Sequence, residues 1–287
     1  MDLRFLETFV AVADCGSIAG AARRLNLTPA ALAQRLHALE GDLGRPLVQR
    51  VGRHTRPTPA GEAVLVKARA LLDSARDLRA AAAGDVPAGQ LRLGAIATAL
   101  TGLLPAVLED MRDRWPEVDY FIRPGSSVDL YHAVIEGELD AALIVRPPFA
   151  IPKSAGFDTL RSEPLVLVVP QHLTGQSVGD LLRDEPFIRY DRNQWGGQLA
   201  DRWLRQAGFA PRDWLELDAL DAILALVSRG LGVSILPDFA KPWPEGLQVA
   251  RLELPGAMAR ELGLICHNQG ARAPAISAFR AACLRCA

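Results

Sequence analysis

Residues 17–43 read SIAGAARRLNLTPAALAQRLHALEGDL, which is the pattern of two short amphipathic helices separated by a break. In the first half, apolar side chains recur at the i, i+3, i+4 and i+7 spacing of one helical face, at Ile18, Ala21, Ala22 and Leu25. Residues 26–28 then interrupt the pattern. Thr28 is a favourable N-cap for a second helix, and Pro29 fits its first position, where no backbone hydrogen bond is lost.

The second helix is predicted to bury a leucine stripe, formed by Leu32, Leu36, Leu39 and Leu43. That stripe leaves polar side chains on or near the opposite face, at Gln34, Arg35 and His37. Two short helices joined by a three-residue turn, the second with polar and basic groups outward, form a helix-turn-helix. A pair of helices in an all-α core has similar periodicity, so this pattern alone leaves that alternative open.

The next residues, LVQRVGRHTRPT at 47–58, predict a small hairpin. The hairpin consists of a strand over 47–50, a turn over 51–54 and a return strand over 55–58. The hairpin is basic, with Arg50, Arg53 and Arg56. Because phosphate contacts supply most of the affinity of proteins for DNA, a basic wing behind the second helix favours a DNA-binding module.

Residues 16–62 resemble the N-terminal signature of the LysR-type transcriptional regulators. The landmarks are Gly16-Ser17, Ala21-Ala22, Leu39-Glu40, Leu43-Gly44, and Thr-Pro-Ala-Gly at 58–61. The resemblance implies a winged helix-turn-helix that contacts double-stranded promoter DNA through Ser17, Thr28, Pro29, Ala30, Ala33, Gln34, Arg35, His37, Arg50 and Arg53. Phosphate contacts are expected from Ser17, Thr28, Arg50 and Arg53.

One departure from the family pattern concerns sequence readout. In most relatives the recognition helix starts Ser-Gln-Pro-Ala-Val-Ser, whereas this chain has Pro29 and Ala33 at the Gln and the second Ser. The start of the helix therefore offers mainly methyl groups to thymine, and polar base contacts fall to Gln34 and Arg35. We expect greater reliance on DNA shape and backbone contacts than in those relatives.

A long helix is predicted to follow, with a heptad-like seam at Val64, Ala68, Leu71, Ala75, Leu78 and Ala82. The seam fits a helix that packs on its own domain as well as one that pairs with another chain. In the regulators that this chain resembles, the equivalent helix pairs two subunits, which implies a homodimer through 59–83 and a homotetramer. The sequence GDVPAG at 84–89 then marks a domain boundary.

Composition limits the class of protein. The chain has 287 residues, a net charge of −1 and four cysteines, and no apolar run reaches the ~18 residues that cross a bilayer. Its N-terminal helix is amphipathic, so we expect no signal peptide and a cytoplasmic protein. Cys283 and Cys286 form a C-x-x-C without a second pair, and a zinc site is not expected.

From residue 90 the pattern alternates between strands and helices, which indicates an α/β fold with a parallel sheet covered by helices. Strands are expected at 91–96, 118–123, 141–145, 165–169, 187–190, 214–217 and 262–266, and residues 230–237 are expected to form a turn that leads into a buried strand. Thr98 is expected to cap a helix, and Asp218 and Asp221 have capping-box spacing. The motifs at 89–94, 137–144 and 230–237 resemble the LysR effector-binding domain, two α/β lobes around a cleft.

The predicted organisation is therefore a DNA-binding domain at 1–58, a linker at 59–89 and an effector-binding domain at 90–287. The first lobe takes in about 91–163 with 268–287, and the second about 164–267. Ligands of open α/β sheets bind at the carboxyl ends of strands. The expected effector site comprises Thr98, Ala99, Ser126, Ser127, Arg146, Tyr190, Arg192, Trp195 and Asp218.

Hydroxyl groups and helix N-termini at such a site suit a carboxylate, and Arg146 or Arg192 is a candidate to clamp it. The sequence thus predicts a LysR-type regulator that responds to a small organic acid. An enzyme is the competing class, but the histidines lie far apart, and neither a nucleotide-cofactor motif nor a catalytic one appears, so no cofactor is expected. A third class is a solute-sensing protein without sequence-specific DNA binding.

Overall fold

The computed structural model describes residues 2–52, 54–82, 86–239, 246–267 and 272–287. The chain divides into two compact units, Met1–Ala82 and Ala83–Ala287. Among the described residues, none of the helices is both long enough and apolar enough to cross a bilayer.

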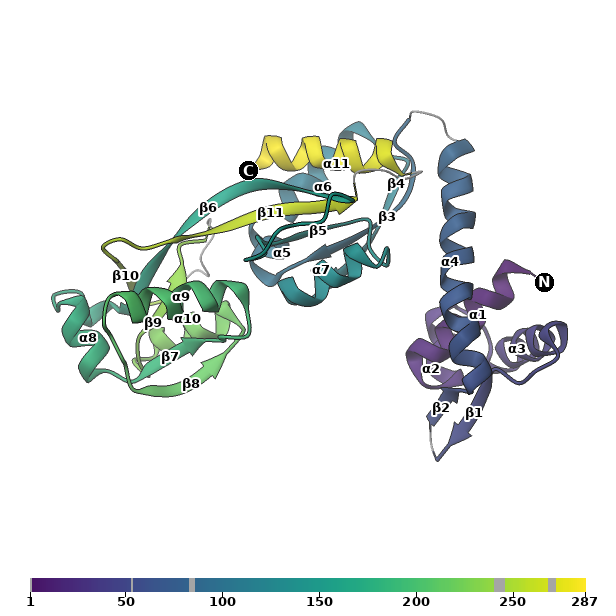
Figure 1. Ribbon diagram of the computed structural model, residues 1–287, viewed down its shortest axis with the longest axis horizontal. Helices are drawn as coiled ribbons and strands as arrows, with labels where there is room; N and C mark the ends of the chain where they lie inside the picture. Colours follow the sequence, from purple (N-terminus) through teal and green to yellow (C-terminus); the bar gives the residue numbers. More distant parts are fainter. Residues whose placement is uncertain (1, 53, 83–85, 240–245, 268–271) are drawn as a thin grey trace. The chain divides into compact units, whose positions relative to one another are not determined.

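The first unit is a winged helix-turn-helix that continues into a long helix (Figure 1). Its elements are α1 (Leu3–Cys15), α2 (Ile18–Arg24), α3 (Pro29–Leu43), β1 (Val48–Val51), β2 (His54–Pro57) and α4 (Pro59–Ala82). β1 and β2 pair antiparallel, and Val51 faces His54 at the tip of the hairpin. The predicted strands therefore form, shifted by one residue.

Local hydrogen bonds explain where α2 and α3 begin. The Ser17 hydroxyl accepts a hydrogen bond from the Gly20 N–H at 3.1 Å, and the Thr28 hydroxyl accepts one from the Ala31 N–H at 3.2 Å. Pro29 occupies the first turn of α3. The predicted break at 26–28 is confirmed, and Asn26 has a positive φ of 52° there.

The wing is fixed to the helices by two polar side chains. Oε1 of Glu40, near the end of α3, accepts from the Leu47 N–H at 2.7 Å. The Thr58 hydroxyl donates to the Pro46 carbonyl at 2.8 Å and accepts from the Gly61 N–H at 3.0 Å, which caps α4. A Cβ at Gly61 would lie 2.0 Å from the Leu47 carbonyl oxygen, so only glycine allows α4 to pass this close to the wing.

The predicted seam of α4 contains both buried and exposed residues. Ala68 packs with the neighbouring Leu72 into the core that α1 and α3 form through Leu6, Phe9, Leu36 and Leu39. Leu71 and Leu78, together with Val66, are exposed. The face of the helix that carries Ala68 and Leu72 thus packs on its own domain, and Val66, Leu71 and Leu78 leave an exposed apolar surface.

The second unit has two lobes. The first contains β3 (Gly89–Ala95), α5 (Ala97–Gly102), α6 (Leu104–Arg114), β4 (Val118–Pro124), α7 (Ser127–Ile135), β5 (Ala141–Val145) and α11 (Ala273–Cys286). The second contains a 3-10 turn (Gln171–Leu173), α8 (Val178–Asp184), β7 (Phe187–Tyr190), α9 (Trp195–Gln206), β8 (Asp213–Leu217), α10 (Leu220–Ser228), β9 (Ser234–Pro237) and β10 (Val249–Glu253). Two long strands, β6 (Ala155–Pro170) and β11 (Ala259–His267), complete the unit.

The expectation of a parallel sheet is wrong for much of the second unit. β3 pairs parallel with β4 and β5, and β7 pairs parallel with β8. β11 instead pairs antiparallel with β5 and β6, and β6 pairs antiparallel with β9 and β10. The order β10-β6-β11-β5-β3-β4 is therefore a mixed sheet.

The two long strands, β6 and β11, account for the antiparallel part of the sheet. β6 pairs with β11 over 155–164 and with β9 and β10 over 165–170, so one strand serves both lobes. Figure 1 shows β6 and β11 side by side. The sequence indicated only the apolar end of β6 and placed 262–266 in the second lobe, whereas those residues pair with β5 and pack in the first-lobe core. It also missed α5, α8 and β10 as separate elements.

Two predicted caps are wrong. Thr98 lies inside α5, whose N-cap is Ile96. α10 has Ala219 as its N-cap without a side-chain hydrogen bond, so Asp218 and Asp221 do not form a capping box. The Thr98 hydroxyl instead makes a tertiary contact, since it accepts a hydrogen bond from Arg260 at 3.1 Å.

Gly61→Ala tests the close approach of α4 to the wing. The added methyl group must displace the backbone at Leu47, and we expect the free energy of unfolding to fall by about 1–3 kcal/mol. Urea unfolding of the full chain measures the change.

Gly41→Ala is the matched control, since a Cβ at that position in α3 has no atom within 4 Å. This control is expected to leave stability unchanged or raise it slightly, because alanine favours helix. Equal effects of the two substitutions would contradict the steric account.

Candidate functional site

A cavity of about 170 Å³ lies between the lobes of the second unit. The lining residues are Ile96, Ala97, Thr98, Gly125, Ser126, Ser127, Tyr190, Gln194, Asp218, Leu220, Asp221 and Arg260. Apart from Arg260 on β11, they lie at or just after the carboxyl ends of β3 and β4 in the first lobe and those of β7 and β8 in the second. This is the usual ligand position in open α/β sheets.

A buried ion pair forms one side of the cavity. Arg260 and Glu163 are direct neighbours across the β11–β6 ladder and are 1% and 4% exposed. The Arg260 Nε donates to Oε2 of Glu163 at 2.7 Å, and its Nη2 donates to the Thr98 hydroxyl at 3.1 Å. The pair thus holds a guanidinium group at the cavity and ties β11 to α5.

The first-lobe wall presents hydroxyl groups and the start of α7. The Ser126 hydroxyl caps α7, since it accepts from the Asp129 N–H at 3.2 Å. The Ser127 hydroxyl accepts from the Val145 N–H at 3.1 Å, which anchors the helix start to β5. Backbone N–H groups and the positive end of the helix dipole favour anionic groups at such a helix start.

The second-lobe wall presents acidic and aromatic groups. Tyr190, at the end of β7, is 5% exposed, and burial raises the pKa of its phenol. A Cβ at Gly197 would lie 1.9 Å from the Asp191 carbonyl oxygen, so glycine is required where α9 starts against the end of β7. Asp218 and Asp221 add two carboxyl groups, both on solvent-exposed residues.

Asp218 has a perturbed carboxyl group. Desolvation raises its pKa to about 6, the negative charge of Asp191 adds to the increase, and the positive charge of Arg260 opposes it. At neutral pH this carboxyl group is largely ionised.

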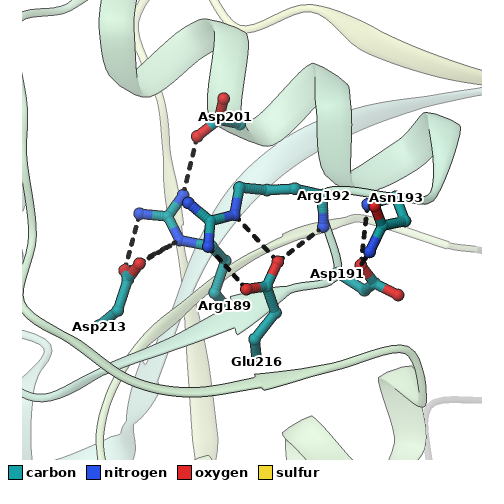
Figure 2. A network of polar contacts seen from close by, with 7 residues as sticks. All are labelled: Arg189, Asp191, Arg192, Asn193, Asp201, Asp213 and Glu216. Atoms are coloured by element: carbon teal, nitrogen blue, oxygen red, sulfur yellow. Dashed lines mark hydrogen bonds and ion pairs between the residues drawn. The ribbon is translucent and has the colours of Figure 1, made fainter.

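A second polar network holds Arg192 and Asn193, the two residues that precede Gln194 in the sequence (Figure 2). Arg189 donates from Nε to both carboxylate oxygens of Asp213 at 2.9 Å and from Nη1 to Asp201 at 3.0 Å. Arg192 donates from Nη2 to Glu216 at 2.7 Å, which lowers the pKa of Glu216 to about 2.

The structure brings together five of the residues predicted for the effector site. Thr98, Ser126, Ser127, Tyr190 and Asp218 all line the cavity.

Four others lie elsewhere. Ala99 is fully buried in the first-lobe core, and Arg192 is turned to Glu216. Arg146 pairs with Glu261, donates to the Thr159 hydroxyl at 2.8 Å and stacks on Phe157. Trp195 packs edge-to-face with Tyr131 and Phe149.

Sequence reasoning missed Arg260, Glu163, Gln194 and Asp221. A charged residue that precedes an apolar strand, as in RELGLI at 260–265, was the available signal for Arg260. Its partner lies 97 positions away, so only the fold reveals the pair. Among the described residues, no group of three or more His, Cys, Asp or Glu side chains is placed to hold a metal ion.

The outer face of α3 in the first unit is open. The exposed residues there are Thr28, Pro29, Ala30, Ala33, Gln34 and His37, and Arg35 is half-buried. Ser17 is half-buried as the α2 cap, and the exposed Arg50 donates from Nε to the Gly52 carbonyl at 3.2 Å. Arg53 lies outside the described residues.

Both units match models of known protein families. Residues 3–62 match the model of the bacterial regulatory helix-turn-helix protein, lysR family, and residues 84–286 match the LysR substrate binding domain. The chain belongs to the LysR family of transcriptional regulators. Since a DNA-binding module is part of the match, a solute sensor without one is not favoured.

Individual LysR relatives agree. The chain is 33% identical to the HTH-type transcriptional regulator AlsR of Bacillus subtilis over 252 residues, which cover 84% of this chain and 82% of AlsR. It is 25% identical to full-length CbnR complexed with its target DNA, with a TM-score of 0.69 and coverage of 100% of both chains. A variant of full-length OxyR from Pseudomonas aeruginosa has the same fold, with a TM-score of 0.70, 23% identity, and coverage of 100% of this chain and 96% of OxyR.

Glu163→Ala tests the buried pair. Removal of the carboxylate leaves the Arg260 charge buried without its partner, and we expect the free energy of unfolding to fall by about 3–5 kcal/mol. Glu216→Ala is the control, because it removes a carboxylate from the exposed Arg192 pair, where water screens the interaction. Urea unfolding measures both variants. If they lose equal stability, burial does not set the cost of breaking the Arg260–Glu163 pair.

Asp218→Asn tests the raised pKa. The folded chain holds the Asp218 proton up to about pH 6, whereas the unfolded chain releases it near 3.8, so ionisation of Asp218 disfavours the folded state. The stability of the wild-type protein relative to the variant should therefore fall as pH rises from about 4 to about 6 and stay level above. If the free energies of unfolding of the wild-type protein and the variant change in parallel between about pH 4 and about pH 6, the pKa of Asp218 is not raised.

Proposed function

We propose that this regulator reads promoter DNA with α3 and the wing, and that its cavity binds a small organic acid which controls transcription. The buried Arg260 guanidinium at the cavity is the observation that carries the second part. The hydroxyl of Thr98 and the start of α7 add hydrogen-bond donors on the same side. Charge-assisted donors of this kind recognise carboxylates.

The DNA-binding part rests on the exposed outer face of α3. Gln34 is exposed there and suits hydrogen bonding to an adenine edge, and the methyl groups of Ala30 and Ala33 suit contact with thymine. Arg50 and Arg53 are proposed to contact phosphates. Promoter DNA as the target supports a cytoplasmic location, and the regulatory family supports a protein without catalytic activity.

We also propose a homodimer through α4 and a homotetramer built from such dimers. The exposed side chains of Val66, Leu71 and Leu78 supply an apolar surface on that helix. A twofold dimer matches a pseudo-palindromic DNA site with one half-site for each recognition helix.

Control by the acid requires that it bind two arrangements of the protein differently, since a ligand shifts an equilibrium only through its differential affinity. The cavity has one wall on each lobe, so a ligand that contacts both walls stabilises one arrangement of the lobes. We propose that this arrangement alters how the bound dimers bend DNA.

Gln34→Ala and Arg50→Ala separate base readout from phosphate binding. Arg50→Ala should weaken binding to every DNA sequence and lower the slope of affinity against salt by about 1. Gln34→Ala should reduce the preference for the chain's own upstream region over scrambled DNA by about 1–3 kcal/mol. Fluorescence anisotropy across a salt series measures both, and unchanged affinities in both variants would refute the assignment.

Thermal unfolding of the full chain with a panel of small carboxylates tests the acid. A ligand at 100 times its dissociation constant adds about 2.7 kcal/mol to stability. At least one carboxylate should raise the unfolding temperature. Stabilisation by cationic or uncharged compounds alone would refute an acidic effector.

A further inference from the structure

The two walls of the cavity differ in charge. The first-lobe wall offers the hydroxyl of Thr98 and the start of α7, where the Ser126 hydroxyl already donates to Oδ2 of Asp129 at 2.7 Å. The second-lobe wall offers the carboxyl groups of Asp218 and Asp221. A ligand that spans the cavity therefore meets hydrogen-bond donors at one end and negative charge at the other.

The charge balance of the cavity is negative. Glu163 neutralises Arg260 through a contact of 2.5 Å between Nη2 and Oε2. Within the part of the chain that the structure describes, no ion pair involves Asp218 or Asp221. A ligand that carried only carboxylate groups would place like charges together, which is unfavourable. A positive group on the ligand removes this repulsion.

Size and apolar lining restrict the ligand further. The volume of about 170 Å³ is below the roughly 300–1,000 Å³ of sites for drug-sized ligands. Ile96, Ala97 and Leu220 supply the apolar part of the lining. The cavity thus suits a small molecule with one apolar side group.

We propose that the effector is a small amino acid, whose carboxylate binds the first-lobe wall and Arg260 and whose ammonium group binds Asp218 and Asp221. This inference rests on the proposed function, because it specifies which class of organic acid the cavity takes. The zwitterion complements both walls at once, so its binding couples the two lobes. A simple carboxylate complements only one of them.

Isothermal titration of the full chain with matched ligand pairs tests the proposal. Each amino acid is compared with the acid that lacks the amino group: alanine with propionate, valine with 3-methylbutanoate, leucine with 4-methylpentanoate, and phenylalanine with 3-phenylpropionate. At least one amino acid should bind about tenfold or more tightly than its partner, a difference of about 1.4 kcal/mol.

Asp218→Asn and Asp221→Asn should reduce that ratio toward one. Among the described residues neither carboxyl group forms an ion pair, so the substitutions leave no partner charge unpaired. Glu253→Gln, an exposed residue of β10 outside the cavity, removes the same charge and should leave the ratio unchanged.

The outcomes distinguish this proposal from the proposed function. If an acid without the amino group binds as tightly as its amino acid or more tightly, the amino-acid proposal is overturned and the organic-acid effector stands. If no member of either series binds at millimolar concentrations, both are overturned. A ratio that persists in both Asn variants also overturns the role of the two carboxylates.

Discussion

The buried pair of Arg260 and Glu163 is the interaction that connects the two long strands of the second unit to its cavity. It lies on the two long strands, β6 and β11, and it reaches α5 through Thr98. A buried ion pair gains little net stability over apolar side chains of similar volume, because desolvation offsets the Coulombic attraction. Its presence is therefore better explained by the guanidinium group that it keeps at the cavity than by stability.

The same strands explain how a ligand can act on the whole unit. β6 pairs with β11 at one end and with β9 and β10 at the other, so one continuous strand forms part of the sheet in both lobes. Two of the remaining cavity residues are held separately: Ser126 caps α7 in the first lobe, and Gln194 in the second lobe follows the loop that the Arg192–Glu216 pair holds. The backbone connects the two lobes through β6 and β11. A ligand that contacts both walls of the cavity adds a further link between the lobes.

Local signals were the part of the structure that could be predicted from sequence. The predicted cap at Thr28 needs only a hydroxyl group three residues before an N–H, and it forms. The same reasoning failed at Thr98, whose hydroxyl accepts a hydrogen bond from Arg260, and at Asp218, which lines the cavity without capping α10. Arg146 and Arg192 were plausible carboxylate clamps until the fold placed Glu261 and Glu216 beside them. Pairings of that kind join residues from distant strands and leave no local pattern.

The most direct measurement of the central claim is ligand-induced thermal stabilisation of the double variant Glu163→Leu/Arg260→Met. Replacement of both charges by apolar side chains should leave the chain folded with stability close to that of the wild-type protein. The account predicts that small acids and amino acids which stabilise the wild-type protein no longer stabilise this variant. Undiminished stabilisation of the folded double variant would contradict the claim that the guanidinium group recognises the ligand.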